Sequence, residues 1–232
     1  MRRLLALTLC STLLVSCAHK NTNTAEGLFD PQKSQAQAES SMGVNEVRHQ
    51  QFALAKPMLE QAIKDDPKLA SSWYSMAYYY EVSGNTQKAE GYYKKAIQVE
   101  PNSGSAHNDY GTFLCRQRRL NECYQQFQLA ASSKDFDNVA SAYENSGLAA
   151  LLMKNDALAK DNFIKALKLN PSLSTSTLEL ARIYHHLGKD DQAKYYLNAF
   201  KKMHPKKDGE AKELYNEIYY GARPPQDLPN PA

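Results

Sequence analysis

The chain has 232 residues, of which 42% are hydrophobic and 23% are charged, the composition of an ordinary water-soluble protein. Ten glycines and ten prolines are too few for a loop-rich β protein, so that class is excluded. The formal net charge of +3 is too small for the basic surface that nucleic-acid binding requires, and no nucleic-acid partner is expected.

Residues 1–16 have the pattern of a signal peptide. Arg2 and Arg3 form a positive start, and an apolar run follows from Leu4 to Val15. This run is shorter than the roughly 20 residues that a membrane-spanning helix needs. The segment therefore predicts export of the chain rather than a spanning anchor.

The end of this segment resembles the lipobox of bacterial lipoproteins. The four residues that carry the resemblance are Leu14, Val15, Ser16 and Cys17. In such lipoproteins the chain is cut before the cysteine, which is then acylated, and several acyl chains give stable membrane attachment. The resemblance implies a covalent lipid on Cys17 and, since Ala18 rather than Asp follows it, the periplasmic face of the outer membrane. The alternative is a plain secretory signal with an incidental cysteine.

Residues 17–35 are mostly polar and predict an acylated N-terminus followed by a flexible tether. Residues 36–69 then give a weak first copy of a helical pair that is clearest in the segment after them. Glu39 and Glu46 stand where large apolar residues are expected, and Pro57 lies within the second helix, at a cost of about 3 kcal/mol. This predicts an atypical terminal repeat with a polar outer face; the alternative is a site that a partner completes.

Residues 70–103 predict two short helices joined by a turn at Ser83, Gly84 and Asn85. The large and small residues that share the inner faces are Trp73, Met76, Ala77, Tyr80, Ala89, Tyr93 and Ala96. The same order recurs in residues 104–139, 140–173 and 174–207, and it resembles the tetratricopeptide repeat, whose period is about 34 residues. The resemblance implies an all-α, right-handed superhelix of about five repeats. Residues 208–220 predict a capping helix, and residues 221–232 predict a disordered tail.

In tetratricopeptide proteins the first helix of each pair lines a concave groove. The residues at those positions here are Tyr74, Tyr78, Glu81, Asn108, Thr112, Glu144, Leu148, Leu151 and Arg182. Tyrosine, asparagine and leucine side chains suit an extended or helical peptide, which they can hold by apolar anchors and backbone hydrogen bonds. The alternative for several of them is simple packing between helices.

Cys115 and Cys123 both lie in the third repeat, and an exported chain meets an oxidising compartment. Cys115 falls one helical turn beyond the position expected to face Cys123. This would separate their Cβ atoms by more than the roughly 3.5 to 4.5 Å that a bridge allows. Two small buried side chains are therefore favoured, and a disulfide remains the open alternative.

The sequence contains no motif for a catalytic nucleophile, a phosphate-binding loop or a paired-cysteine metal site. His185 and His186 are adjacent and do not share a helix face, which favours a solvated surface over a metal site. We therefore expect a binding protein rather than an enzyme, with no metal and no cofactor beyond the lipid. Arrays with polar ends need no partner for stability, so a monomer is expected.

Two segments carry a closer resemblance: AsnAspTyrGlyThrPheLeuCys at 108–115 and TyrGluAsnSerGlyLeu at 143–148. Together with the lipobox, the tether and the five repeats, they resemble the type IV pilus biogenesis and stability lipoproteins of the PilF/PilW family. That family acts as a pilotin, which brings secretin subunits to the outer membrane and promotes their multimerisation. The alternative function is a periplasmic tetratricopeptide lipoprotein that scaffolds cell-wall or outer-membrane protein assembly, and a weaker one is a hydrolase adaptor.

Overall fold

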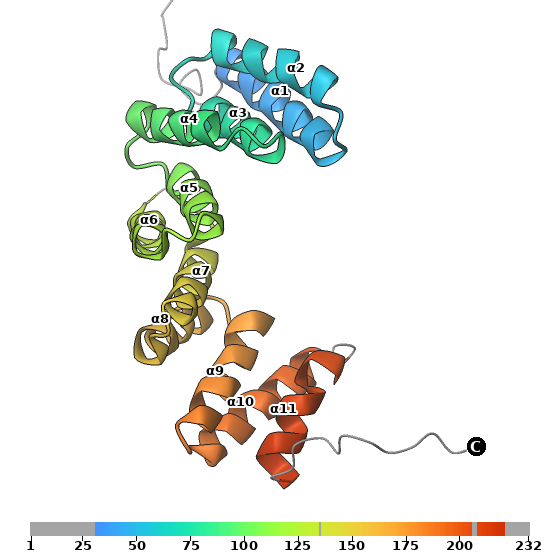
Figure 1. Ribbon diagram of the computed structural model, residues 1–232, viewed down its shortest axis with the longest axis vertical. Helices are drawn as coiled ribbons and strands as arrows, with labels where there is room; N and C mark the ends of the chain where they lie inside the picture. The colour runs from blue at the N-terminus through green and yellow to red at the C-terminus, as the bar shows by residue number, and fades with distance from the viewer. Residues whose placement is uncertain (1–30, 135, 206–207, 221–232) are drawn as a thin grey trace, which may run out of the picture.

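The computed structural model describes residues 31–134, 136–205 and 208–220, and within them the chain forms eleven helices and no strand (Figure 1). The helices are α1 (Pro31–Arg48), α2 (Phe52–Asp65), α3 (Ala70–Val82), α4 (Thr86–Val99), α5 (Gly104–Arg116), α6 (Leu120–Ser132), α7 (Val139–Leu152), α8 (Asp156–Leu169), α9 (Ser174–His186), α10 (Asp190–Met203) and α11 (Asp208–Tyr220). This confirms the predicted all-α fold. The lipobox with Cys17, most of the predicted tether and the predicted tail lie outside the described residues.

The helices stack as successive pairs along the long axis of the molecule (Figure 1). Each odd-numbered helix up to α9 packs on the even-numbered helix that follows it, and each even-numbered helix packs on the next odd one. In the described part of the chain, successive odd-numbered helices also approach one another along their main chains, whereas successive even-numbered helices lie further apart and meet through long side chains, as where Gln128 of α6 donates a hydrogen bond of 3.0 Å to Asn162 of α8. Because the crowded row of a curved array is its inner row, the odd-numbered helices line the concave side.

Small residues on the inner row set how closely each pair packs. A Cβ atom added to Gly147 of α7 would lie 2.5 Å from a ring carbon of Phe163 on α8, and that ring is fully buried. Gly111 of α5 stands in the same way against Phe127, at 2.9 Å. Both distances are too short for a real carbon–carbon contact, so the pairs require glycine there. The alternation of small and large residues in the sequence thus reflects which positions of the paired helices pack against each other.

The first helix begins earlier than predicted. α1 starts at Pro31, inside the segment 17–35 assigned to the tether, with proline at the helix N-terminus, where its missing N–H costs nothing. The residues that α1 buries are Ala36, Ser40, Gly43 and Val47. Most of them are small, so a search for large apolar residues at helical spacing passes over this face. α2 continues through Pro57, whose side chain is exposed.

α11 occupies the residues predicted for the capping helix. Its Leu214 and Ile218 are buried in a cluster with Leu197 and Phe200 of α10, which closes the apolar end of the array. None of the described helices is both long enough and apolar enough to cross a membrane.

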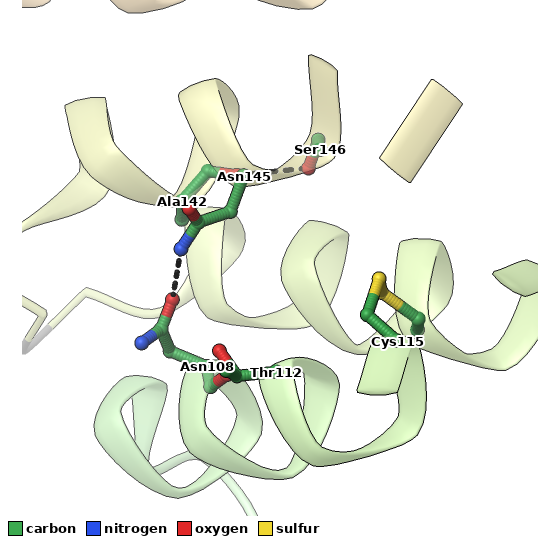
Figure 2. The surroundings of a disulfide bond; sticks show 7 residues. Asn108, Thr112, Cys115, Ala142, Asn145 and Ser146 are labelled. Atoms are coloured by element: carbon green, nitrogen blue, oxygen red, sulfur yellow. Dashed lines mark hydrogen bonds between the residues drawn. A yellow bond between two sulfur atoms is a disulfide. The ribbon is translucent and has the colours of Figure 1, made fainter. Parts of the chain in front are cut away.

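Cys115 in the last turn of α5 and Cys123 in the first turn of α6 are joined by a disulfide, with their Cα atoms 5.2 Å apart (Figure 2). The favoured expectation of two separate thiols is therefore wrong. That expectation assumed that Cys123 faces the residue one turn before Cys115, which is Gly111. Gly111 instead faces Phe127, one turn further along α6, and in an antiparallel pair this register puts the two cysteines opposite each other.

Candidate functional site

A hollow of about 290 Å³ opens on the inner row, where α1, α3 and α5 meet over the middle of α4; we call it the inner hollow. The residues that line it are Val44, Arg48, Tyr74, Ser75, Tyr78, Tyr93, Asp109, Thr112 and Arg116. It has the size of one long side chain rather than of a helix. Its lining mixes aromatic rings, hydroxyl groups and charges of both signs, which is the composition of a recognition site.

Tyrosine rings form the apolar walls of the inner hollow. Tyr93 packs against Tyr110 and Phe113 with ring centroids 5.8 and 5.2 Å apart, so its position is fixed by the core of the third repeat. Tyr74 and Tyr78 project from α3, one turn apart. Burial raises the pKa of Tyr74 to about 12, so this hydroxyl stays protonated at physiological pH.

Glu81 lies behind the hollow, and both of its carboxylate oxygens are occupied. Arg116 forms an ion pair with one oxygen, and the Tyr93 hydroxyl donates a hydrogen bond of 2.9 Å to the other. Only 11% of the Glu81 side chain is exposed, and the pairing compensates for the loss of hydration. Glu81 therefore positions Arg116 and Tyr93 in the wall of the hollow.

Asp109, on the same wall, is bonded far less well. Its carboxyl accepts one hydrogen bond, from Nδ2 of Asn108 at 3.3 Å, and makes no other hydrogen bond or ion pair to the described part of the chain. Burial raises its pKa to about 6; the Asn108 bond and the charge of Arg116 work against that rise, and Glu81 adds to it. Asp109 is thus a desolvated acid with spare acceptor capacity facing a hollow.

The structure brings together only part of the predicted groove. Tyr74, Tyr78 and Thr112 line the inner hollow, with Glu81 behind them. Asn108 accepts a hydrogen bond of 2.9 Å from Asn145, which ties α5 to α7 (Figure 2).

The other predicted groove residues are engaged in packing between repeats. Glu144 accepts hydrogen bonds from the backbone N–H of Ser176 at 3.0 Å and from its hydroxyl at 2.7 Å, so it caps the start of α9. Leu148 and Leu151 are half-buried against the cluster around Phe163. Arg182 differs from them, because its ion pair of 3.5 Å is with Glu179 of its own helix. Glu144, Leu148 and Leu151 thus hold the array together rather than forming one continuous groove.

Several lining residues escaped the sequence analysis. Arg48 and Val44 belong to the first repeat, whose irregular pattern favoured a simple cap. Arg116 and Asp109 lie beside the positions that were transferred from tetratricopeptide proteins. No clear signal in the sequence marks Asp109, because its neighbours on the same helix face, Ser105 and Thr112, are polar and only half-buried.

A second, more apolar hollow of about 460 Å³ lies on the outer row between α8 and α10; we call it the outer hollow. The residues that line it are Ile164, Leu167, Lys168, Pro171, Thr177, Tyr195, Tyr196, Ala199 and Met203. Tyr195 is 69% exposed at this place, unusually open for an aromatic residue. No group of three or more His, Cys, Asp or Glu side chains suited to a metal ion occurs in the part of the chain that the structure describes.

The tetratricopeptide repeat family matches residues 41–107, 140–173 and 176–207, together more than half of the chain. The type IV pilus assembly protein PilF of Pseudomonas aeruginosa is 30% identical over 146 residues, which are 63% of this chain and 58% of PilF. An uncharacterised protein of Haemophilus influenzae is 30% identical over 115 residues, 50% of this chain and 64% of that protein. The chain thus matches less than two thirds of the length of either relative.

Solved structures share the fold. The structure of Pseudomonas aeruginosa PilF has a TM-score of 0.69 at 23% identity, covering 83% of this chain and 96% of that one. PilW, described as a widely conserved type IV pilus biogenesis factor, has a TM-score of 0.67 at 24% identity, with 79% and 84% covered. MamA has a TM-score of 0.59 at 21% identity, with 73% and 96% covered. These likenesses show the fold, and the fold alone does not select a role.

Proposed function

We propose that this chain, which belongs to the tetratricopeptide repeat family, is an outer-membrane lipoprotein of type IV pilus biogenesis that acts as a pilotin. It binds secretin subunits and promotes their outer-membrane localisation and multimerisation. The observation that carries the proposal is the similarity to PilF over 146 residues. Its role is binding rather than catalysis.

In this mechanism one part of the chain attaches the protein to the membrane and another part binds the secretin. Acyl chains on Cys17 attach the protein to the periplasmic face of the outer membrane, because several chains together give stable anchoring. The inner hollow then holds an extended segment of the secretin. Tyr74 and Tyr78 supply apolar anchors, and Thr112, which donates its own proton to the Asn108 carbonyl at 3.0 Å, can accept a hydrogen bond from the segment.

The experiment is capture from outer-membrane extract with the full acylated chain, followed by identification of the eluted proteins. A secretin in the eluate, lost on changing Tyr74→Ala and Tyr78→Ala together, supports the proposal. Tyr195→Ala is the matched control, since it removes an exposed tyrosine from the outer row and should leave capture unchanged. A Cys17→Ala chain that still delivers secretin normally to the outer membrane would sink the anchoring step.

A second candidate is a periplasmic lipoprotein scaffold for cell-wall or outer-membrane protein assembly complexes. The outer hollow favours it, because a scaffold needs a surface on each side to join two proteins. Recovery of a murein synthase or hydrolase in place of a secretin, with loss on Tyr195→Ala, would select this role. On either proposal the array works as a monomer, which light scattering of the purified chain tests.

A further inference from the structure

We infer that the inner hollow recognises a lysine or arginine side chain of the bound segment, and that Asp109 is the residue that selects it. The inference rests on the proposed function only for the identity of the partner. The selection itself is a property of the hollow and can be measured without a secretin.

The two carboxylates at this place are treated in opposite ways. Glu81 has both oxygens bonded, by Arg116 and by Tyr93, so its charge is already compensated within the chain. Asp109 has a single bond of 3.3 Å and lines the open space. A partly desolvated carboxylate with a single long hydrogen bond costs free energy, and a donor brought by a ligand recovers it.

The charges around Asp109 favour a cation over the alternatives. Arg116 is already neutralised by Glu81, and Arg48 is exposed at the rim, where solvent screens it. An acidic side chain would face Asp109 at short range, and an apolar one would bury it without adding a donor. A cation entering the hollow instead pairs with the carboxylate through a charge-assisted hydrogen bond.

The aromatic walls add to this selection. Tyrosine faces attract ammonium and guanidinium groups. The chain uses the same contact elsewhere on its surface: Lys201 lies 4.1 Å from the ring centre of Tyr215, and Lys88 lies 5.0 Å from that of Tyr80. The volume of about 290 Å³ accommodates one such long side chain.

Binding should then depend on pH. The groups that face Asp109 are Tyr74, Tyr78 and Glu81 from α3, Tyr93 from α4, Arg116 from its own helix and Arg48 from α1. Burial raises the pKa of both Tyr74 and Tyr93, so neither hydroxyl ionises between pH 5 and 8. Because burial raises the pKa of Asp109 to about 6, the carboxylate is present above that value and is lost below it. A bound cation lowers this pKa, so affinity rises with pH through this window.

The test uses two synthetic peptides, acetyl-Ser-Val-Arg-Val-Ser-amide and the same peptide with citrulline, which has the shape of arginine without its charge. Their affinities for the full chain are measured by ligand-observed NMR at pH 7.5 and pH 5.0. The arginine peptide should bind about tenfold more tightly than the citrulline peptide at pH 7.5, the range expected of a hydrogen bond to a charged group. The preference should shrink at pH 5.0.

Asp109→Asn should remove the preference and its pH dependence, whereas Asp161→Asn, which changes an exposed acid on α8, should keep both. Equal affinities of the two peptides for the wild-type chain, or no binding of either up to about 10 mM, overturn the inference. These outcomes are separable from the proposed function. If the Asp109→Asn variant captures secretin as efficiently as the wild-type chain, the pilotin role stands and the selection by Asp109 fails. If the wild-type chain prefers the arginine peptide but captures no secretin, the selection stands and the pilotin role fails.

Discussion

Replacing Asp109 by asparagine should stabilise the folded chain at neutral and alkaline pH. The pKa of Asp109 is about 6 in the folded state against an ordinary value of 3.8, so the folded chain binds this proton more tightly than the unfolded chain. The acid therefore costs no stability when it is protonated in both states, below pH 3.8, and costs the most when it is ionised in both, above pH 6. Asparagine has nearly the same shape and never ionises.

The magnitude follows from the difference between the two pKa values. About two units correspond to at most about 3 kcal/mol at pH 8. The carboxyl is partly open to the hollow, and the exchange of an oxygen for an amide group loses some bonding, so we expect a gain of about 1 to 2 kcal/mol. For a chain of this length, each kcal/mol corresponds to a melting temperature about 2 to 4 °C higher.

The assay is urea unfolding followed by circular dichroism at several values between pH 4 and pH 8, with Asp161→Asn as the control. Taking the difference between variant and wild type removes the contributions of all other titrating groups. The advantage of Asp109→Asn should be near zero at pH 4 and grow through pH 6. If the variant is less stable at pH 8, or if its advantage is the same at every pH, then Asp109 is held by favourable contacts and the reasoning about an underbonded acid fails.

Three further predictions concern the array itself. Gly147→Ala should lower the free energy of unfolding by about 1 to 3 kcal/mol, because the new Cβ meets the buried ring of Phe163. The control Gly91→Ala, in open space on α4, should raise the free energy of unfolding by about 0.5 to 1 kcal/mol. Equal effects of the two substitutions in urea titrations would refute this packing. Glu144→Ala should lower the free energy of unfolding by about 1 to 2 kcal/mol, because it removes the cap of α9, and should leave secretin capture unchanged. Loss of capture by a folded variant would show instead that Glu144 contributes to a binding groove. Reducing the disulfide, which closes a loop with a sequence separation of 8, should cost about 2.5 kcal/mol, and unchanged stability under reductant would contradict it.

The fold was predictable because small and large residues alternate along the sequence at the positions where paired helices pack. Gly111 and Gly147 each precede an aromatic residue by a fixed interval, and the structure places each glycine against that ring. The start of α1 was not predictable by the same means, since its buried face is built mostly of small residues such as Ala36 and Ser40. The disulfide was missed because the pairing register inside a repeat is a three-dimensional quantity, and a shift of one turn decides which residues face each other.

The site was less predictable for a related reason. Transferring concave positions one helix at a time selects Tyr74 and Tyr78, which line the inner hollow, and also Glu144, which instead caps the start of the next repeat. A hollow is made where three helices meet, and Arg48 reaches it from a helix whose pattern is irregular. Sequence periodicity describes one helix face and carries no information on such a junction.

Glu90 of α4 and Asp109 of α5 are two carboxylates whose hydrogen bonding differs, and with it the pH range in which each one titrates. Glu90 accepts bonds from Lys94 at 2.7 Å, Arg119 at 2.8 Å and Tyr110 at 3.1 Å, and the hydrogen bonds from Lys94 and then Arg119 lower its pKa to about 2. Its stabilisation, about 1 kcal/mol after solvent screening, is present above pH 4.5 and is lost as the pH falls towards 2. Asp109 titrates near pH 6 instead. Between these windows, near pH 5, the array should remain folded while its preference for a basic side chain is weakened, so loss of binding there with unchanged circular dichroism distinguishes a recognition acid from a structural one.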